Sequence, residues 1–200
     1  MSDWKQEWII GLYSGNTGER AAAAREIYAS GHVRANAATR EWRTNDELRR
    51  LLGDQPQVTV GVAVQPEQFA KIRAANGMPR LAEVPVEQDA MEFELHFSAG
   101  IALDVLTSRE PEGGGAIAKF LAKQGEGVQQ VEFRCENVNR AAGILREQFG
   151  VTGIYAEARP GADGTRVNFF LVAGADGEKV LIELYEPAMG DEATSRSVLR

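Results

Sequence analysis

Val180-Leu181-Ile182-Glu183-Leu184-Tyr185 closes the second of two similar stretches in this 200-residue sequence and sets one carboxylate into an otherwise apolar strand. The first copy ends on the corresponding stretch Ile101-Ala102-Leu103-Asp104-Val105-Leu106. We therefore expect Asp104 and Glu183 on equivalent strands of two repeated units, facing one cavity. The repeat decides the fold class, because each copy is a small sheet that must bury one of its faces.

The two copies have the same order of predicted elements. The first has a strand over 57–64, a helix over 66–75 and strands over 80–86, 91–97 and 101–107. The second has a strand over 128–135, a helix over 138–149 and strands over 153–158, 166–173 and 180–186, with a turn at 174–177 before the last. The pattern predicts an α+β fold built from two βαβββ modules. One helix per module leaves the other face of each sheet free to form a concavity.

Domain boundaries follow from shifts in composition. We predict a helical N-terminal extension over 1–53 and one larger domain over 57–187. The larger domain divides into module one at 57–108, a linker helix within 112–126 and module two at 127–187, and residues 188–200 form a C-terminal tail.

The extension has apolar residues at helical spacing, with breaks expected at 14–18 and 30–32 and a helix start at 44–47. It is interpreted as a cap that adds to the core, and a lid or a partner-binding arm is the alternative. The break at 30–32 makes His32 a helix-end residue rather than a metal ligand.

Composition excludes several functions. The chain is 44% hydrophobic and 26% charged, with a net charge of −7, so it lacks the excess of cations that non-specific nucleic-acid binding requires. No apolar run is long enough to span a membrane. The single cysteine, Cys135, permits no internal disulfide, and we expect a cytoplasmic protein.

Strand alternation predicts which side chains line the concavity. The valines of the first strand should face the core, because they share one side of it. The same test applied to the other strands places on the free face Glu92, Glu94, His96, Ala102, Asp104, Leu106, Gln130, Glu132, Arg134, Arg166, Asn168, Phe170, Leu181, Glu183 and Tyr185. A solvent-exposed sheet would show a similar alternation. The mixture of apolar and ionisable groups favours a cleft.

One segment resembles a known family. Gly125-Glu126-Gly127-Val128-Gln129-Gln130-Val131-Glu132-Phe133, preceded by Ala116-Ile117-Ala118-Lys119-Phe120-Leu121 and followed by Leu181-Ile182-Glu183-Leu184, is similar to the second half of methylmalonyl-CoA epimerases and glyoxalase I. These belong to the vicinal oxygen chelate superfamily, which includes bleomycin-resistance proteins. The resemblance covers about 57–187. It implies a U-shaped cleft with a divalent metal held by one residue from each of four strands.

The resemblance implies a metal set of Thr59, Asp104, Gln130 and Glu183 in this sequence. Thr59 and Gln130 stand where the epimerases carry histidine, so both imidazoles are missing. An all-oxygen set suits Mg, Mn or Ca better than Zn.

Three functions stay open. The first is binding of a small organic ligand, a carboxylate or acyl compound, without turnover. The second is a metal-assisted isomerase or lyase that uses Asp104, Gln130 and Glu183 to move a proton next to a carbonyl. The third is a protein-interaction module formed by the N-terminal helices. A homodimer is kept as an open alternative.

The residues that would act in the cleft are predicted as two groups. The candidate proton-transfer groups are Glu183, Glu132 and His96, and a turn at 98–100 would place Glu94 opposite Asp104 and His96 opposite Ala102. The candidate ligand-binding residues are Arg134, Arg166, Asn168, Phe170, Tyr185 and Glu94, with the arginines holding a carboxylate.

Overall fold

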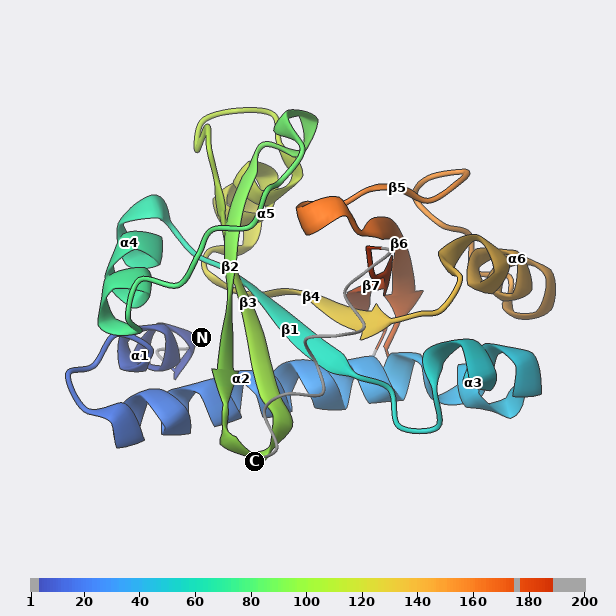
Figure 1. Ribbon diagram of the computed structural model, residues 1–200, viewed down its shortest axis with the longest axis horizontal. Helices are drawn as coiled ribbons and strands as arrows, with labels where there is room; N and C mark the ends of the chain where they lie inside the picture. Colours follow the sequence, from blue (N-terminus) through green and yellow to red (C-terminus); the bar gives the residue numbers. More distant parts are fainter. Residues whose placement is uncertain (1–3, 175–176, 189–200) are drawn as a thin grey trace.

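The computed structural model describes residues 4–174 and 177–188 (Figure 1). Its strands are β1 (Val58–Ala63), β2 (Ala90–Phe97), β3 (Ile101–Ser108), β4 (Gly127–Arg134), β5 (Arg159–Pro160), β6 (Arg166–Ala173) and β7 (Lys179–Glu186). Its α-helices are α1 (Trp4–Gly11), α2 (Thr17–Ala38), α3 (Asp46–Leu52), α4 (Pro66–Ala75), α5 (Ala116–Gln124) and α6 (Val138–Phe149). Short 3-10 turns are η1 (Arg40–Thr44), η2 (Val86–Gln88), η3 (Ser98–Gly100) and η4 (Ala162–Gly164). The middle of the predicted turn at 174–177 and the predicted tail beyond residue 188 lie outside the described residues.

The strands form one seven-stranded sheet in the order β2-β3-β1-β4-β7-β6-β5. β1 and β4 run antiparallel at its centre, where Val60 pairs with Val131. On each side of this pair the next strand, β3 or β7, is parallel to its neighbour, and the strand beyond it is antiparallel. The two halves thus repeat one arrangement, which confirms the predicted α+β fold of two paired modules with helices before them.

Two predicted strands are wrong in detail. Residues 80–86 form no strand, because Pro79 precedes the segment and Pro85 lies within it, and neither has an N–H to donate to a ladder. Ala82 N still donates one hydrogen bond to Glu92 O in β2, at 3.0 Å. Residues 153–158 make only an isolated bridge between Gly153 and Phe170. There the Asn168 side chain bonds both the N–H and the C=O of Tyr155, replacing a backbone ladder.

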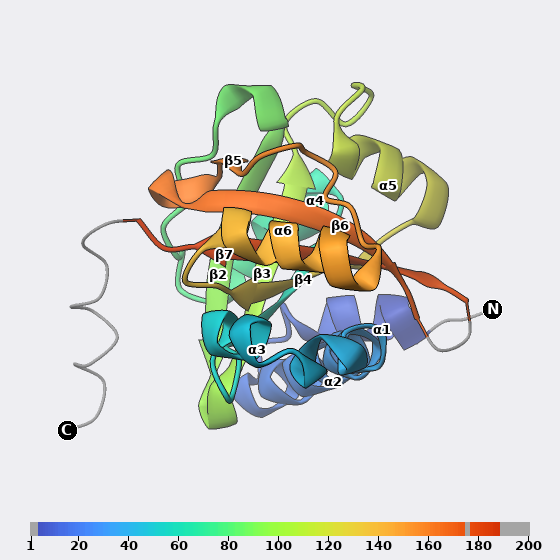
Figure 2. The ribbon, with the colours of Figure 1, turned by 90° about the vertical axis from the view of Figure 1, so that its right-hand side faces the viewer.

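Helix α2 lies across one face of the sheet, called here the helix face, and contacts β1, β3, β4 and β7 (Figure 2). The helix starts at its N-cap Asn16, whose side chain accepts the N–H of Gly18 at 2.8 Å. The predicted break at 30–32 is wrong. A Cβ on Gly31 would lie only 2.7 Å from Val60 Cγ1, so the glycine permits close packing instead of ending the helix. His32 is a mid-helix residue stacked on Tyr28 at 5.4 Å between ring centroids.

A continuous core fills the helix face. It joins side chains of the N-terminal helices, such as Ile9 and Ile27, to strand residues Val60, Leu103 and Ile182. The predicted helix start at 44–47 is confirmed, since the Asn45 side chain caps α3. The helices before β1 therefore extend the core of the sheet. No helix in the described part of the chain is long and apolar enough to cross a membrane.

Candidate functional site

A cavity of about 640 Å³ lies on the other face of the sheet, between the two modules. Both modules contribute side chains to its wall. Those with ionisable or amide groups are Arg80, Gln88, Glu92, Glu94, Asp104, Gln129, Gln130, Glu132, Tyr155, Arg159, Asp163, Glu183 and Tyr185. The volume is typical of a site for a small organic molecule.

The sheet register places the two acids singled out in the sequence at equivalent positions. Asp104 in β3 lies beside Gly61 in β1, and Glu183 in β7 lies beside Glu132 in β4. Because β1 and β4 cross antiparallel at Val60 and Val131, a twofold rotation there relates Gly61 to Glu132 and Asp104 to Glu183. Both acids line the one cavity, Asp104 from β3 in the first module and Glu183 from β7 in the second.

Three carboxyl groups of the cavity wall are almost fully buried: Asp104, Glu132 and Glu183. Burial, followed by the repulsion of neighbouring acids, raises the pKa of Asp104 and of Glu183 well above their usual values. Burial likewise raises the pKa of Glu132 to about 8 and that of Glu92 to about 7. At neutral pH the cluster therefore carries fewer negative charges than it has carboxyl groups. The carboxyls that stay protonated can donate hydrogen bonds.

Gln130 joins two of these acids. Its Nε2 donates to Glu183 Oε2 at 2.6 Å and to Glu132 Oε1 at 3.1 Å. Asp104, by contrast, has a buried Oδ1 that no group in the described part of the chain hydrogen-bonds. A buried acceptor that lacks a partner is costly unless a proton or a ligand reaches it.

The predicted metal set is only partly assembled. Asp104, Gln130 and Glu183 line the cavity, but Thr59 is buried and absent from its wall. Gln130 uses its amide N–H groups on the two glutamates. Within residues 4–174 and 177–188, no group of three or more His, Cys, Asp or Glu side chains is arranged to hold a metal ion. The side chains as they stand do not fit a metal site.

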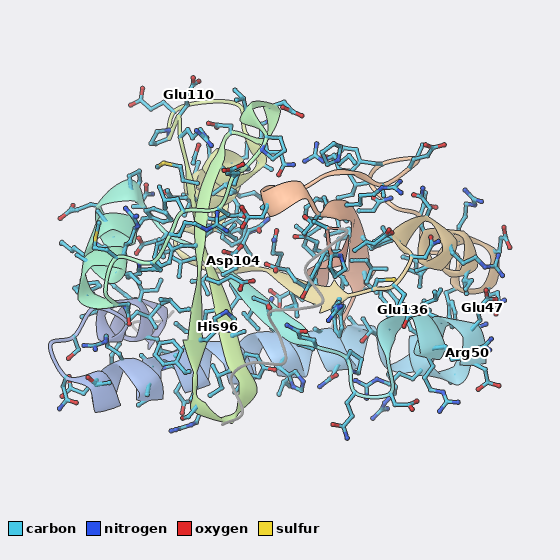
Figure 3. The ribbon with its side chains drawn as sticks, in the orientation of Figure 1. Glu47, Arg50, His96, Asp104, Glu110 and Glu136 are labelled. Carbon is cyan, nitrogen blue, oxygen red and sulfur yellow. The ribbon has the colours of Figure 1, made fainter. Side chains whose placement is uncertain are left out.

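His96 lies apart from the other predicted proton-transfer groups. The predicted hairpin register is confirmed, with Glu94 opposite Asp104 and His96 opposite Ala102. His96 nevertheless lies closer than Asp104 to the turn that joins β2 and β3, and its side chain is exposed (Figure 3). Its Nε2 bonds Glu94 Oε2 at 2.9 Å, and this bond raises the pKa of His96. His96 shares the face of Glu94, as alternation predicted, but Glu94 lines the cavity and His96 lies outside its wall.

The predicted ligand-binding face of β6 is inverted. Val167 and Phe169 line the cavity, and Phe169 pairs with Glu183. Asn168 and Phe170 are fully buried and point to the helix face, where Phe170 packs edge-on against Trp42. Alternation misled here because apolar residues fill both faces of this strand.

The two predicted arginine anchors do not reach the cavity wall. Arg166 is exposed at the start of β6, on the same side as Asn168 and Phe170, so its placement on the free face is wrong. Arg134 shares the cavity side of the sheet, in register with Tyr185, but lies outside the wall. Tyr185 does line the cavity, and burial raises its phenol pKa.

The sequence reasoning missed Tyr155, Arg159 and Phe169. The Arg159 guanidinium lies over the Tyr155 ring, 4.1 Å from its centroid, and 5.9 Å from that of Phe169. Tyr155 lies in an irregular segment and Arg159 in the two-residue strand β5, which is too short to show alternation, so no pattern in the sequence points to them. Phe169 could have been found from its position opposite Glu183, had the β6–β7 register been anchored on that glutamate.

Loops from the two modules are joined along the cavity wall. Arg80, in the loop before β2, makes two hydrogen bonds to the Asp163 carboxylate, at 3.0 and 2.6 Å. The backbone N–H of Asp163 in η4 donates to Glu83 O, and the N–H of Glu83 donates to the Asp163 carboxylate. Gln88 Nε2 donates to the carbonyl of Pro160. The charge of Arg80 is therefore taken up by Asp163.

Comparison with solved structures finds glyoxalase-like relatives. Methylmalonyl-CoA epimerase from Mycobacterium tuberculosis is 32% identical, with 65% of this chain and 86% of that chain covered and a TM-score of 0.54. A methylmalonyl-CoA epimerase in complex with methylmalonyl-CoA and NH4+ is 30% identical, with 66% and 93% covered and a TM-score of 0.53. A hypothetical protein from Bacillus halodurans is 26% identical, with 64% and 91% covered and a TM-score of 0.53.

Two other comparisons found nothing. No protein-family model matches the sequence, and no curated protein matches it.

Proposed function

Because the chain belongs to the vicinal oxygen chelate superfamily of glyoxalase-like proteins, we propose that it binds a small acyl compound in the cavity between its modules. The observation that carries this proposal is the group of buried carboxyls, Asp104, Glu132 and Glu183, that both modules direct into one cavity. Protonated carboxyls can donate hydrogen bonds to the carbonyl oxygen of such a ligand. Support comes from a relative that was solved with methylmalonyl-CoA bound.

A second function, proton transfer next to the ligand carbonyl, is favoured by the pKa of Glu132 at about 8. A group with a pKa near the working pH both accepts and donates protons readily. Glu132 and Glu183 are linked through Gln130. In this proposal one of them, ionised, removes the proton from carbon, while a protonated neighbour hydrogen-bonds the oxygen on which negative charge develops. Returning a proton to carbon would complete an epimerase-type or isomerase-type reaction.

One experiment tests both functions. The protein is incubated with methylmalonyl-CoA in deuterated water, and binding is measured by calorimetry and deuterium incorporation at the acyl carbon by mass spectrometry. We expect binding and incorporation, with the Glu183→Gln variant slowing incorporation by about 100-fold or more. Glu110→Gln, the same charge change at an exposed residue far from Asp104 (Figure 3), is the control. Binding without deuterium incorporation would support the binding function and contradict proton transfer. Absence of binding would contradict both functions.

A metal-assisted variant of the second function remains the alternative. It would need Gln130 to turn its amide oxygen toward Asp104 and Glu183 and so give up its two hydrogen bonds. Mg, Mn or Ca would suit these oxygen donors.

A further inference from the structure

Arg159 places a cationic group in the wall of the same cavity that the acids line. It lies in β5 and is half-buried, with its guanidinium held over the ring of Tyr155. A guanidinium fixed on an aromatic ring keeps its planar fork of N–H groups free for a second partner. The position of this cation is therefore set by packing and not by an ion pair.

The buried Nε of Arg159 has no hydrogen-bond partner among residues 4–174 and 177–188. The other arginine of the wall, Arg80, is bound to Asp163 through both ends of its guanidinium. A buried donor that lacks a partner is destabilising, and in a native structure it calls for an explanation such as a ligand.

Resting on the function proposed above, we propose that Arg159 binds a carboxylate carried by the acyl ligand, in addition to its carbonyl. The fork of an arginine matches a carboxylate with two parallel hydrogen bonds. Tyr155 and Phe169 flank the same guanidinium and offer apolar surface for the ligand carbon atoms beside it. The site would then select acyl compounds with a second, acidic group over those without one.

Two ligands that differ only in this carboxylate test the proposal. Methylmalonyl-CoA carries the carboxylate and propionyl-CoA lacks it. Calorimetric dissociation constants are measured for both ligands on the wild type, Arg159→Gln, Arg159→Lys and Arg166→Gln. Arg166→Gln is the matched control, because it removes the same charge from an exposed residue outside the cavity.

We expect the wild type to bind methylmalonyl-CoA at least about tenfold more tightly than propionyl-CoA. Arg159→Gln should abolish this preference, because it weakens binding of methylmalonyl-CoA by at least about tenfold more than binding of propionyl-CoA. A circular dichroism spectrum that matches the wild type shows that the variant is folded. Arg159→Lys should retain part of the preference and Arg166→Gln all of it.

Two results would overturn the role of Arg159 and leave ligand binding intact. One is equal affinity of the wild type for the two ligands. The other is a preference that survives in Arg159→Gln. Failure of the wild type to bind either ligand would overturn the proposed function together with this inference.

Discussion

At the residue scale, the cluster of Asp104, Glu132 and Glu183 destabilises the folded protein when the pH rises above the mildly acidic range. The pKa of Glu132 in the folded protein is about 8 against a usual 4.5, so the unfolded chain releases its proton first and stability falls as pH rises between these values. We therefore predict that Glu183→Gln, which removes one acid from the cluster, keeps stability near that of the wild type at pH 5 and raises it by about 1 kcal/mol at pH 8. Urea unfolding at the two pH values measures this, with Glu110→Gln as the exposed control. A strong loss of stability at pH 8 would reveal an ionic partner of Glu183.

At the element scale, the seating of α2 on the sheet depends on one glycine. A Cβ on Gly31 would meet Val60 at 2.7 Å, whereas a Cβ on Gly143, in the middle of α6, would meet nothing within 4 Å. Alanine is the better helix former at both positions, so Gly143→Ala should stabilise the protein by about 0.5–1 kcal/mol. Gly31→Ala should instead destabilise it by about 1–3 kcal/mol, because the helix must move off β1. Chemical unfolding of the two variants compares these opposite signs. Equal stabilisation of both would mean that α2 is not packed closely on Val60.

At the scale of the whole molecule, the pseudo-twofold arrangement brings acids from both modules together but does not complete a metal site. Thr59 is absent from the cavity wall, and the amide N–H groups of Gln130 are bonded to Glu132 and Glu183. We predict that protein treated with a chelator and then titrated with Mn²⁺ binds no stoichiometric ion and shows no shift in its melting temperature. Elemental analysis and calorimetry provide the measurement, with Asp104→Asn as the variant that removes a potential oxygen ligand. One equivalent of Mn²⁺ bound by the wild type and lost in that variant would restore the metal-assisted alternative.

How well strand alternation predicted the residues that line the cavity differs from strand to strand. In β1, β3, β4 and β7 one side of the strand is strongly apolar, so alternation placed Asp104, Glu132 and Glu183 on the correct face. In β6 both sides are mostly apolar, and the same rule put Asn168 and Phe170 in a cavity that they do not reach. Arg159 lies in a two-residue strand that is too short to show a period, and its position depends on pairing with Val167 and on contacts with Tyr155 and Phe169.

The sequence by itself determined the repeated modules and the facing pair Asp104 and Glu183. Repeats and strand alternation are local patterns, so they can be recognised from the order of residues alone. The tertiary structure alone decided that Gly31 continues a helix, that Gln130 bridges two glutamates and that Arg159 lines the cavity beside Tyr155. Each of these facts depends on a contact between segments far apart in the chain. Such contacts follow from how whole elements pack, and no spacing within one element encodes them.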